Sequence, residues 1–249
     1  MDKRSLKGKV AIVTGSGRGL GYGIAKKLAE EGATVMISDV NEENAKNAVA
    51  SLKELGAEAD YILCDVSNWE QADALVKGTI ERFGKIDILV NNAVITRDRT
   101  LKKMTKEEWD SVIAVNLSGM FYTMSPTVKH MIENQYGRII NISSASYLNG
   151  NIGQCNYAAA KAGVIALTRT AGKELGKFKI TCNAIVPGFM KTEMTANVPD
   201  KAKEIMVGKI SLGEMGTPED VGNMVAFLAS DEASHMTQGI YNVDGGMIL

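Results

Sequence analysis

The sequence predicts a single-domain α/β fold over residues 1–249, with a doubly wound, mostly parallel sheet of seven strands and helices on both faces. Short β-branched runs alternate with amphipathic stretches from end to end. The runs are apolar almost throughout, which is typical of strands that are covered on both faces of a parallel sheet. Because no linker, charge block or internal repeat divides the chain, we expect one domain.

Seven segments have the composition of buried strands. They are short, rich in valine and isoleucine, and bounded by polar residues or glycine. In chain order the predicted strands are Lys9–Thr14, Thr34–Asp39, Asp60–Asp65, Ile86–Asn91, Arg138–Ser143, Lys179–Val186 and Ile240–Val243.

Six longer stretches between these runs have helical periodicity. Ile24 and Leu28, for example, are four residues apart, which places both on one face of a helix. In chain order the predicted helices are Leu20–Glu31, Glu42–Leu55, Trp69–Phe83, Lys106–Glu133, Tyr157–Gly176 and Glu219–Ser230. Pro218 opens the last of these, and we expect Thr217 to be its N-cap.

Composition and charge argue against several classes of protein. The net charge is −1, so the chain has no electrostatic footprint for nucleic acid or for an anionic membrane. No apolar run approaches the ~20 residues of a membrane span, and the polar N-terminus does not resemble a signal peptide. Three scattered cysteines (Cys64, Cys155, Cys182) and two histidines form neither a disulfide framework nor a metal-spaced cluster. We therefore expect a cytoplasmic protein without a bound metal.

A glycine-rich turn, T-G-S-G-R-G-L-G, follows the first predicted strand directly. Gly15, Gly19 and Gly21 permit a tight turn and a close approach of the main chain, so that the N-terminus of the next helix can bind a pyrophosphate. A strand before the turn and a helix after it are the context in which this motif binds dinucleotides in Rossmann-type folds. A glycine turn without a ligand is the alternative.

Asp39 ends the second predicted strand, roughly 20 residues after the turn, where an acidic residue binds the adenosine ribose of a dinucleotide. A carboxylate at that point repels a 2′-phosphate, so the sequence favours NAD(H) as the cofactor. Arg18, inside the turn, is the contrary signal because a guanidinium there can reach a phosphate. NADP(H) therefore stays open, as does a solvated Asp39 with no ligand.

Tyr157 and Lys161 are one helical turn apart in N-Y-A-A-A-K, and Ser144 lies thirteen residues before the tyrosine. An ammonium four residues from a phenol on the same helix face favours the phenolate and lowers the pKa of the tyrosine. A serine hydroxyl beside them can hold the carbonyl oxygen that the phenol protonates. By itself this spacing is also that of a packed tyrosine and a solvated lysine.

Several motifs, taken in chain order, resemble the short-chain dehydrogenase/reductase family: T-G-S-G-R-G-L-G, N-N-A, a helical asparagine, S-S, Y-A-A-A-K, P-G-F-M-K-T and a terminal D-G-G. They cover essentially the whole chain. The segments G-Q-C-N-Y-A-A-A-K-A-G, I-T-R-D-R-T and G-F-M-K-T-E-M-T most resemble the 3-oxoacyl-[acyl-carrier-protein] reductases of that family.

The resemblance implies a role for each matching residue. Tyr157 is the general acid/base, Lys161 lowers its pKa, and Ser144 orients the carbonyl. Asn116 holds a water that relays protons toward the lysine. The implied cofactor contacts are Gly15, Arg18, Gly19, Leu20 and Gly21 at the pyrophosphate turn, Asp39, Asn91 and Ala93 at the adenosine ribose, Asp65 and Val66 at the adenine, Tyr157 and Lys161 at the nicotinamide ribose, and Pro187, Gly188 and Thr192 at the nicotinamide carboxamide.

Three of these positions also have a purely structural interpretation. Asn116 can be a buried, hydrogen-bonded amide in a helix interior. Asp65 can be an acid at a helix N-terminus, ahead of Ser67. Ser144 can be the cap of the following turn. Because Ser143 is its neighbour, only the family's thirteen-residue interval selects Ser144 as the catalytic serine.

The chain departs from the family pattern in three places. Val94 stands where N-N-A-G has its glycine, which predicts either a turn with negative φ or a shifted local path. Glu133, Asn134 and Gln135 occupy positions where acyl-carrier-protein reductases carry basic residues. Those reductases usually take NADPH, which Asp39 disfavours. An acyl carrier protein is therefore left open as a partner.

Residues 189–212 follow the nicotinamide turn, and we expect them to form a mobile flap over the substrate. Phe189, Met190, Met194 and Met206 either give this flap an adaptable apolar surface or pack beneath it. The first interpretation favours an apolar or acyl substrate.

The sequence therefore predicts an oxidoreductase that transfers a hydride between nicotinamide and a carbonyl or secondary alcohol. A 3-oxoacyl thioester is the first substrate class, and a steroid or other bulky secondary alcohol is the second. A nucleotide-binding regulator without catalysis is the rival of another class. The resemblance also implies a homotetramer formed through the helices Lys106–Glu133 and Tyr157–Gly176 and through the C-terminal strand. The small residues Ala158, Ala162 and Ala166 can pack either on a partner helix or on the sheet.

Overall fold

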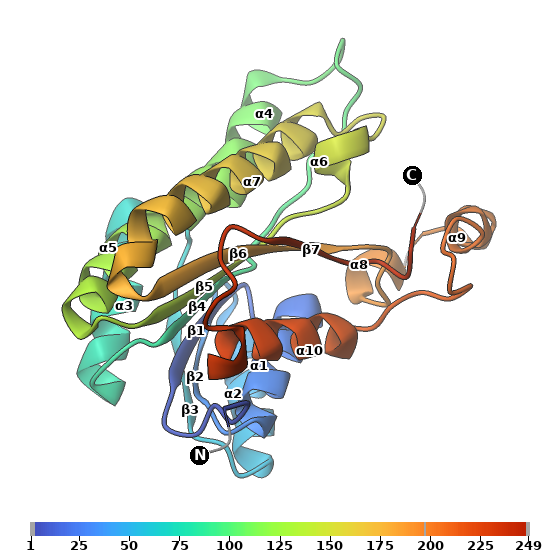
Figure 1. Cartoon of the computed structure of the whole chain (residues 1–249). Helices are drawn as coiled ribbons and strands as arrows, with labels where there is room; N and C mark the ends of the chain where they lie inside the picture. The colour runs from blue at the N-terminus through green and yellow to red at the C-terminus, as the bar shows by residue number, and fades with distance from the viewer. Residues whose placement is uncertain (1–2, 197, 248–249) are drawn as a thin grey trace.

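A computed structural model describes residues 3–196 and 198–247, apart from the side chain of Met194. It contains one sheet of seven strands in the order β3-β2-β1-β4-β5-β6-β7, and all six strand pairings are parallel (Figure 1). The strands are β1 (Val10–Thr14), β2 (Thr34–Asp39), β3 (Ala59–Leu63), β4 (Ile88–Asn91), β5 (Gly137–Ile142), β6 (Ile180–Pro187) and β7 (Ile240–Val243). The predicted fold class and all seven predicted strands are confirmed, with ends that differ by at most two residues.

Helices cover both faces of this sheet (Figure 1). One face carries α1 (Gly19–Glu30), α2 (Glu42–Glu54) and α10 (Pro218–Ala229), and the other carries α3 (Trp69–Phe83), α4 (Lys106–Ile113), α5 (Gly119–Asn134) and α7 (Cys155–Leu175). Three shorter helices are α6 (Ser146–Asn149), α8 (Glu193–Ala196) and α9 (Asp200–Val207). Within the described ranges, no helix combines the length and the hydropathy needed to span a bilayer.

The two faces of the sheet produce two hydrophobic cores. In β1, Ala11 and Val13 pack toward α1 and α10, whereas Ile12 between them packs toward α3 and α5. In β5, Ile140 and Ile142 face the first core and Ile139 faces the second. Because successive side chains of a strand point to opposite faces, both sets must be apolar, which explains the unbroken apolar runs in the sequence.

The strand order reverses between β1 and β4. From β1 the chain proceeds outward through β2 and β3, and it then returns to place β4 on the other side of β1. In open α/β sheets this reversal leaves a crevice at the carboxyl ends of the two strands, where ligands bind. The glycine turn follows β1 at this point, and the N-N-A segment includes the end of β4.

One predicted helix is wrong as a continuous element. The stretch Lys106–Glu133 forms α4 and α5 with a π-helical turn, Ala114–Ser118, between them. Such wide turns are rare in helices and are frequent at functional sites. At the start of α10, by contrast, Thr217 is the N-cap as predicted, and it forms a reciprocal capping box with Asp220.

Candidate active site

The glycine turn is a close-packed piece of main chain. Gly15 has a φ of +61° and Gly19 a φ of +58°, values that L-residues rarely adopt. A Cβ atom on Gly21 would lie 2.2 Å from the carbonyl oxygen of Gly15. Asn92 holds the turn from the β4 side, because its Nδ2 donates to the carbonyl oxygens of Thr14 and Gly15, both at 3.0 Å. Asn92 was not among the predicted site residues.

The N-terminus of α1 follows this turn without a side-chain cap. Arg18 is its N-cap, has an extended main chain and makes no capping hydrogen bond, and the first turn holds no acidic residue. The first N–H groups of a helix have no partner within the helix, and they carry the positive end of its dipole. A turn without side chains, followed by an uncapped helix N-terminus, fits the pyrophosphate of a dinucleotide.

Asp39 is fixed beside the same turn. Its Oδ2 accepts from the main-chain N–H of Gly17 at 2.9 Å, and its Oδ1 accepts from that of Asn41 at 3.0 Å. The carboxylate is therefore held at the end of β2, where the sequence places the ribose contact. Arg18 points elsewhere, because its guanidinium pairs with Glu193 of α8 at 2.9 Å.

The N-N-A segment uses its first side chain internally. Asn91 is buried, donates to Asn141 of β5 at 2.8 Å and accepts from Thr123 of α5 at 2.6 Å. Asn141 in turn donates to Thr168 of α7 at 2.9 Å, which links two strands to two helices. Only the main chain of Asn91 remains for the predicted nucleotide contact.

Ala93 contacts the glycine turn directly, since a Cβ atom added to Gly15 would lie 2.7 Å from its Cα. The next residue, Val94, does not have a positive φ, so the turn accommodates the valine without a left-handed main chain. This is the first of the two outcomes predicted for that departure from the family pattern.

Asp65 and Val66 lie beyond the end of β3. Asp65 is exposed, and its Oδ1 accepts from the main chain and the hydroxyl of Ser67, as in the structural interpretation. Val66 is buried against Gly119 of α5. Their predicted adenine contacts stay predictions.

The predicted carboxamide turn lies at the end of β6. A Cβ atom on Gly188 would lie 2.7 Å from the Cα of Asp244, so glycine is required for the turn to pack against the terminal D-G-G segment. Pro187 is the last residue of β6, and the main chain of Thr192 donates to the hydroxyl of Thr195. Their predicted contact with a nicotinamide stays a prediction.

The two neighbouring serines at the end of β5 have different roles. Ser143 is buried, and its hydroxyl donates to the main-chain carbonyl of Lys161 at 3.0 Å. Ser144 is half-buried and lies close enough to the phenol of Tyr157 to oppose the rise of its pKa. The Oγ of Ser144 accepts from the hydroxyl of Ser146 at 3.2 Å. The geometry therefore selects Ser144 as the serine beside the phenol, as the thirteen-residue interval predicted.

Lys161 is almost completely buried, with an exposed fraction of 1%. Its Nζ donates to the carbonyl oxygen of Ile142 at 2.8 Å and lies 5.6 Å from the centre of the Tyr157 ring. Ile142 is the last residue of β5, and only β4 lies between β5 and β1 in the sheet. The trio thus lies at the same edge of the sheet as the glycine turn.

The lowering of the tyrosine pKa that the spacing predicted is wrong. Burial raises the pKa of Tyr157 and outweighs the opposing effect of Ser144, while the carboxylate of Asp98 raises it further. Burial also lowers the pKa of Lys161 to about 7, which favours the uncharged amine far more than in an exposed lysine. The spacing indicated proximity correctly, but desolvation determines the protonation states.

Asn116 lies in the π-helical turn and is fully buried. Its side chain forms a pair of hydrogen bonds with the main chain of Ile95, both at 2.9 Å. These two bonds agree with the structural interpretation of a buried, hydrogen-bonded amide. A water relay at this residue stays a prediction.

Residues 15–248 match the family described as enoyl-(acyl carrier protein) reductase. The chain is also 43% identical to the 3-oxoacyl-[acyl-carrier-protein] reductase of Thermotoga maritima, over 98% of this chain and 99% of the relative. The chain belongs to the short-chain dehydrogenase/reductase family. It is thus an NAD(P)-dependent oxidoreductase that acts on a carbonyl or secondary alcohol, and the rival prediction of a regulator without catalysis is dropped.

Other relatives agree with this placement. The 3-oxoacyl-[acyl-carrier-protein] reductase of Staphylococcus aureus is 43% identical over 97% of this chain and 98% of its own. A crystal structure described as a gluconate dehydrogenase from Agrobacterium tumefaciens superposes with a TM-score of 0.96, at 30% identity over the full length of both chains.

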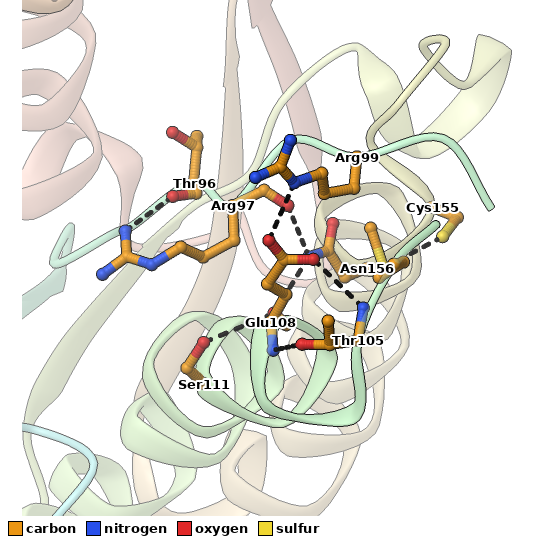
Figure 2. A network of polar contacts seen from close by, with 9 residues as sticks. Thr96, Arg97, Arg99, Thr105, Glu108, Ser111, Cys155 and Asn156 are labelled. Atoms are coloured by element: carbon orange, nitrogen blue, oxygen red, sulfur yellow. Dashed lines mark hydrogen bonds and ion pairs between the residues drawn. The ribbon is translucent and has the colours of Figure 1, made fainter. Parts of the chain in front are cut away.

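This short-chain dehydrogenase/reductase fixes its tyrosine through a residue that was not among the predicted site residues. Asn156 is fully buried, and its Oδ1 accepts from the main-chain N–H of Tyr157 at 2.8 Å. The Nδ2 of Asn156 donates to the carbonyl oxygens of Arg97 and Glu108, both at 3.1 Å (Figure 2). Asn156 therefore joins the first turn of α7 to α4 and to the loop after β4. An asparagine directly before the tyrosine was the only signal in the sequence.

The segment 189–212 of this reductase family member projects from the sheet edge with α8 and α9 (Figure 1). Met190 is buried in the core on the α10 side, so it packs beneath the segment, whereas Phe189 and Met206 are partly exposed. The side chain of Met194 lies outside the described residues. A groove of about 860 Å³ opens between this segment, α10 and β7, and none of Ser144, Tyr157 and Lys161 lines it.

We predict that the buried amine of Lys161 destabilises the protein at neutral pH. Because the pKa of Lys161 falls from 10.5 to about 7 on folding, the unfolded chain binds more protons between these values, and stability rises with pH across this window. Lys161→Met removes this dependence. From pH 7 to pH 10 the free energy of unfolding of the natural chain should therefore gain roughly 3 kcal/mol from this lysine, and that of the variant should lack this gain. Urea denaturation at both pH values measures it, and a constant difference would contradict the burial of a titrating amine.

We also predict that Asn156 positions Tyr157. Asn156→Ala should lower kcat by roughly 10- to 100-fold, because small displacements of a reacting group are costly, while the Kd for the dinucleotide changes less than threefold. Ser111→Ala is the matched control, since it removes a hydrogen bond to the same Glu108 carbonyl oxygen without touching α7. A kcat that is unchanged, or a parallel loss of dinucleotide affinity, would show that Asn156 has no positioning role.

Proposed function

We propose that this protein reduces 3-oxoacyl thioesters with NADH. The observation that carries the proposal is the gathering of three side chains at the sheet edge that bears the glycine turn: the phenol of Tyr157, the neighbouring hydroxyl of Ser144, and the Lys161 amine 5.6 Å from the centre of the tyrosine ring. The named activity of relatives 43% identical over nearly the whole chain supports the substrate class.

Each residue of the trio has a separate task in this reaction. Ser144 and the phenol of Tyr157 converge on the carbonyl oxygen of the substrate and hold it. The phenol gives its proton to that oxygen, and the product is a 3-hydroxyacyl thioester. When bound, the nicotinamide supplies the hydride that reduces the carbonyl carbon. Lys161 stabilises the phenolate that remains until solvent returns a proton.

The protonation states of the site support the reducing direction. Tyr157 has a raised pKa, so at physiological pH it is the neutral acid that a carbonyl reduction requires. Oxidation of an alcohol would start from the phenolate, which burial disfavours. The resting protonation state of Tyr157 is therefore the one from which carbonyl reduction begins.

The choice of NADH rests on two charges. The Asp39 carboxylate lies beside the glycine turn and repels a 2′-phosphate, and Glu193 neutralises Arg18, the cation nearest to that turn. NADPH, which the relatives' chemistry leaves open, would need Arg18 to leave Glu193.

The assembly that we propose is a homotetramer formed in part through α5 and α7. Ala162 and Ala166 are exposed on α7, so this small-residue face does not pack on the sheet, and Phe121 of α5 is 49% exposed. The mass of the particle in solution tests this assembly.

We assign the protein to the cytoplasm, in line with its three free cysteines, and cell fractionation tests that assignment.

Tyr157→Phe removes the proton donor and leaves the ring. We expect turnover of an acetoacetyl thioester to fall by roughly 10²- to 10⁴-fold, while the fluorescence-measured Kd for NADH changes less than threefold. Tyr122→Phe, which alters a tyrosine on α5, should leave turnover within twofold. Substantial activity in the Tyr157 variant would refute the proposed proton transfer. If a crotonyl thioester, a hydroxysteroid or gluconate is a far better substrate of the natural enzyme, the proposed substrate class is wrong.

The cofactor preference can be tested by binding alone. We expect the natural protein to bind NADH more tightly than NADPH, and Asp39→Asn to shift the ratio of the two Kd values toward NADPH by about tenfold. Glu193→Gln should shift it in the same direction by a smaller factor, because both partners of this ion pair are about two-thirds exposed. Glu31→Gln, which breaks an ion pair at the other end of α1, is the control. Tighter binding of NADPH by the natural protein would overturn the assignment.

A further inference from the structure

One carboxylate, that of Asp98, is held beside the reacting groups. Its Oδ2 accepts from the side-chain amide of Gln154 at 2.9 Å, and Gln154 is the N-cap of α7, three residues before Tyr157. Residues that are three apart in a helix are neighbours on its surface. The hydrogen bond therefore attaches Asp98 to the part of α7 that bears the phenol.

Main-chain contacts on both sides of Asp98 fix the loop in this position. The carbonyl oxygen of Arg97 accepts from the buried side chain of Asn156 at 3.1 Å. The main-chain N–H of Arg99 donates to the carbonyl oxygen of Gly153 at 2.8 Å. Because Asp98 lies between these two contacts, its position relative to α7 is set by the main chain as well as by its own side chain.

The charge of Asp98 acts on the reacting groups. Burial raises the pKa of Tyr157 most, and the carboxylate of Asp98 raises it further. A charge that destabilises the phenolate also destabilises any other anion at the same point. Burial favours the uncharged form of the Lys161 amine, so this group offsets the acid less than an exposed lysine would.

The two arginines that flank Asp98 in the chain are bound to other groups. The Nη1 of Arg97 donates to the carbonyl oxygen of Thr96 at 2.8 Å, and Arg99 pairs with Glu108 of α4 at 3.0 Å (Figure 2). Within residues 3–196 and 198–247, no ion pair involves Asp98. Its negative charge is therefore not cancelled by a direct contact with a cation.

We propose that Asp98 is a specificity-determining residue that excludes substrates with a negative charge next to the reacting carbonyl. This inference deepens the proposed function and rests on it. In a free 3-oxo acid the carboxylate is one carbon away from the carbonyl that Ser144 and Tyr157 hold, so it cannot leave the field of Asp98. In a thioester of the same acid this group carries no charge. Asp98 thus selects the thioester by repulsion of the acid and needs no contact with the thioester itself.

Asp98→Asn removes this charge and keeps the hydrogen bond, because the remaining side-chain oxygen can still accept from Gln154. We measure acetoacetate as a competitive inhibitor of the reduction of acetoacetyl-N-acetylcysteamine, an uncharged thioester. The selectivity is the ratio of the Ki for acetoacetate to the KM for the thioester. At low salt this ratio should fall by about fivefold or more in the variant, since two charges near a protein surface interact by about this much.

Salt and matched variants separate charge from structure. The difference in selectivity between the natural protein and Asp98→Asn should shrink as NaCl rises from about 0.02 M to about 0.5 M, because screening weakens the repulsion. Asp98→Glu keeps the charge, and its selectivity should stay within twofold of the natural value. Asp110→Asn is the control, since it removes an exposed acid of α4 that pairs with Lys106.

Three results would overturn the proposal: an unchanged selectivity in Asp98→Asn, the same fall in Asp110→Asn, or a fall that does not depend on salt. If the natural protein does not reduce the thioester, the proposed reaction fails, and binding still tests Asp98. The Kd of acetoacetate for the protein with bound NADH is then measured by the quenching of NADH fluorescence. Tighter binding to Asp98→Asn supports the repulsion, whereas equal binding, or no binding to either protein, contradicts it.

Discussion

The active site depends on the way in which β5 and α7 share a buried lysine. The Nζ atom of Lys161 donates to the last carbonyl of β5, and the main-chain carbonyl of the same residue accepts from Ser143 just beyond that strand. These two contacts fix the rotation of α7 against the sheet edge. Since Tyr157 is one turn earlier on the same helix, its phenol is fixed as well, next to Ser144. An ammonium would lose its hydration in this position, and the pKa of the lysine falls accordingly.

Burial acts on the two titrating groups in opposite directions with one result. It raises the pKa of the tyrosine and lowers that of the lysine, so both tend toward their uncharged forms. A low-dielectric site of this kind strengthens the hydrogen bonds offered to a carbonyl oxygen, because water does not compete for them.

Rigid and adaptable parts are separated along the sheet edge. The chain Thr123–Asn91–Asn141–Thr168 ties α5 and α7 to two central strands, and Asn156 ties the start of α7 to α4. The segment 189–212, by contrast, contains α9, in which no described side chain is buried. Chemistry that needs fixed distances therefore lies on the first part. The mobile flap predicted over 189–212 stays a prediction.

The sequence alone determined the parts that local pattern controls. Apolar runs gave the seven strands, the positions of Gly15 and Gly21 predicted the turn, and the interval from Ser144 to Tyr157 predicted their contact. Other features depended on segments that are distant in the chain. The π-helical turn within 106–133 has the same apolar composition as a straight helix, and the role of Asn156 depends on carbonyl groups 48 and 59 residues away. The direction of the pKa shifts was likewise decided only by the tertiary structure, because spacing brings two groups together but only packing removes their water.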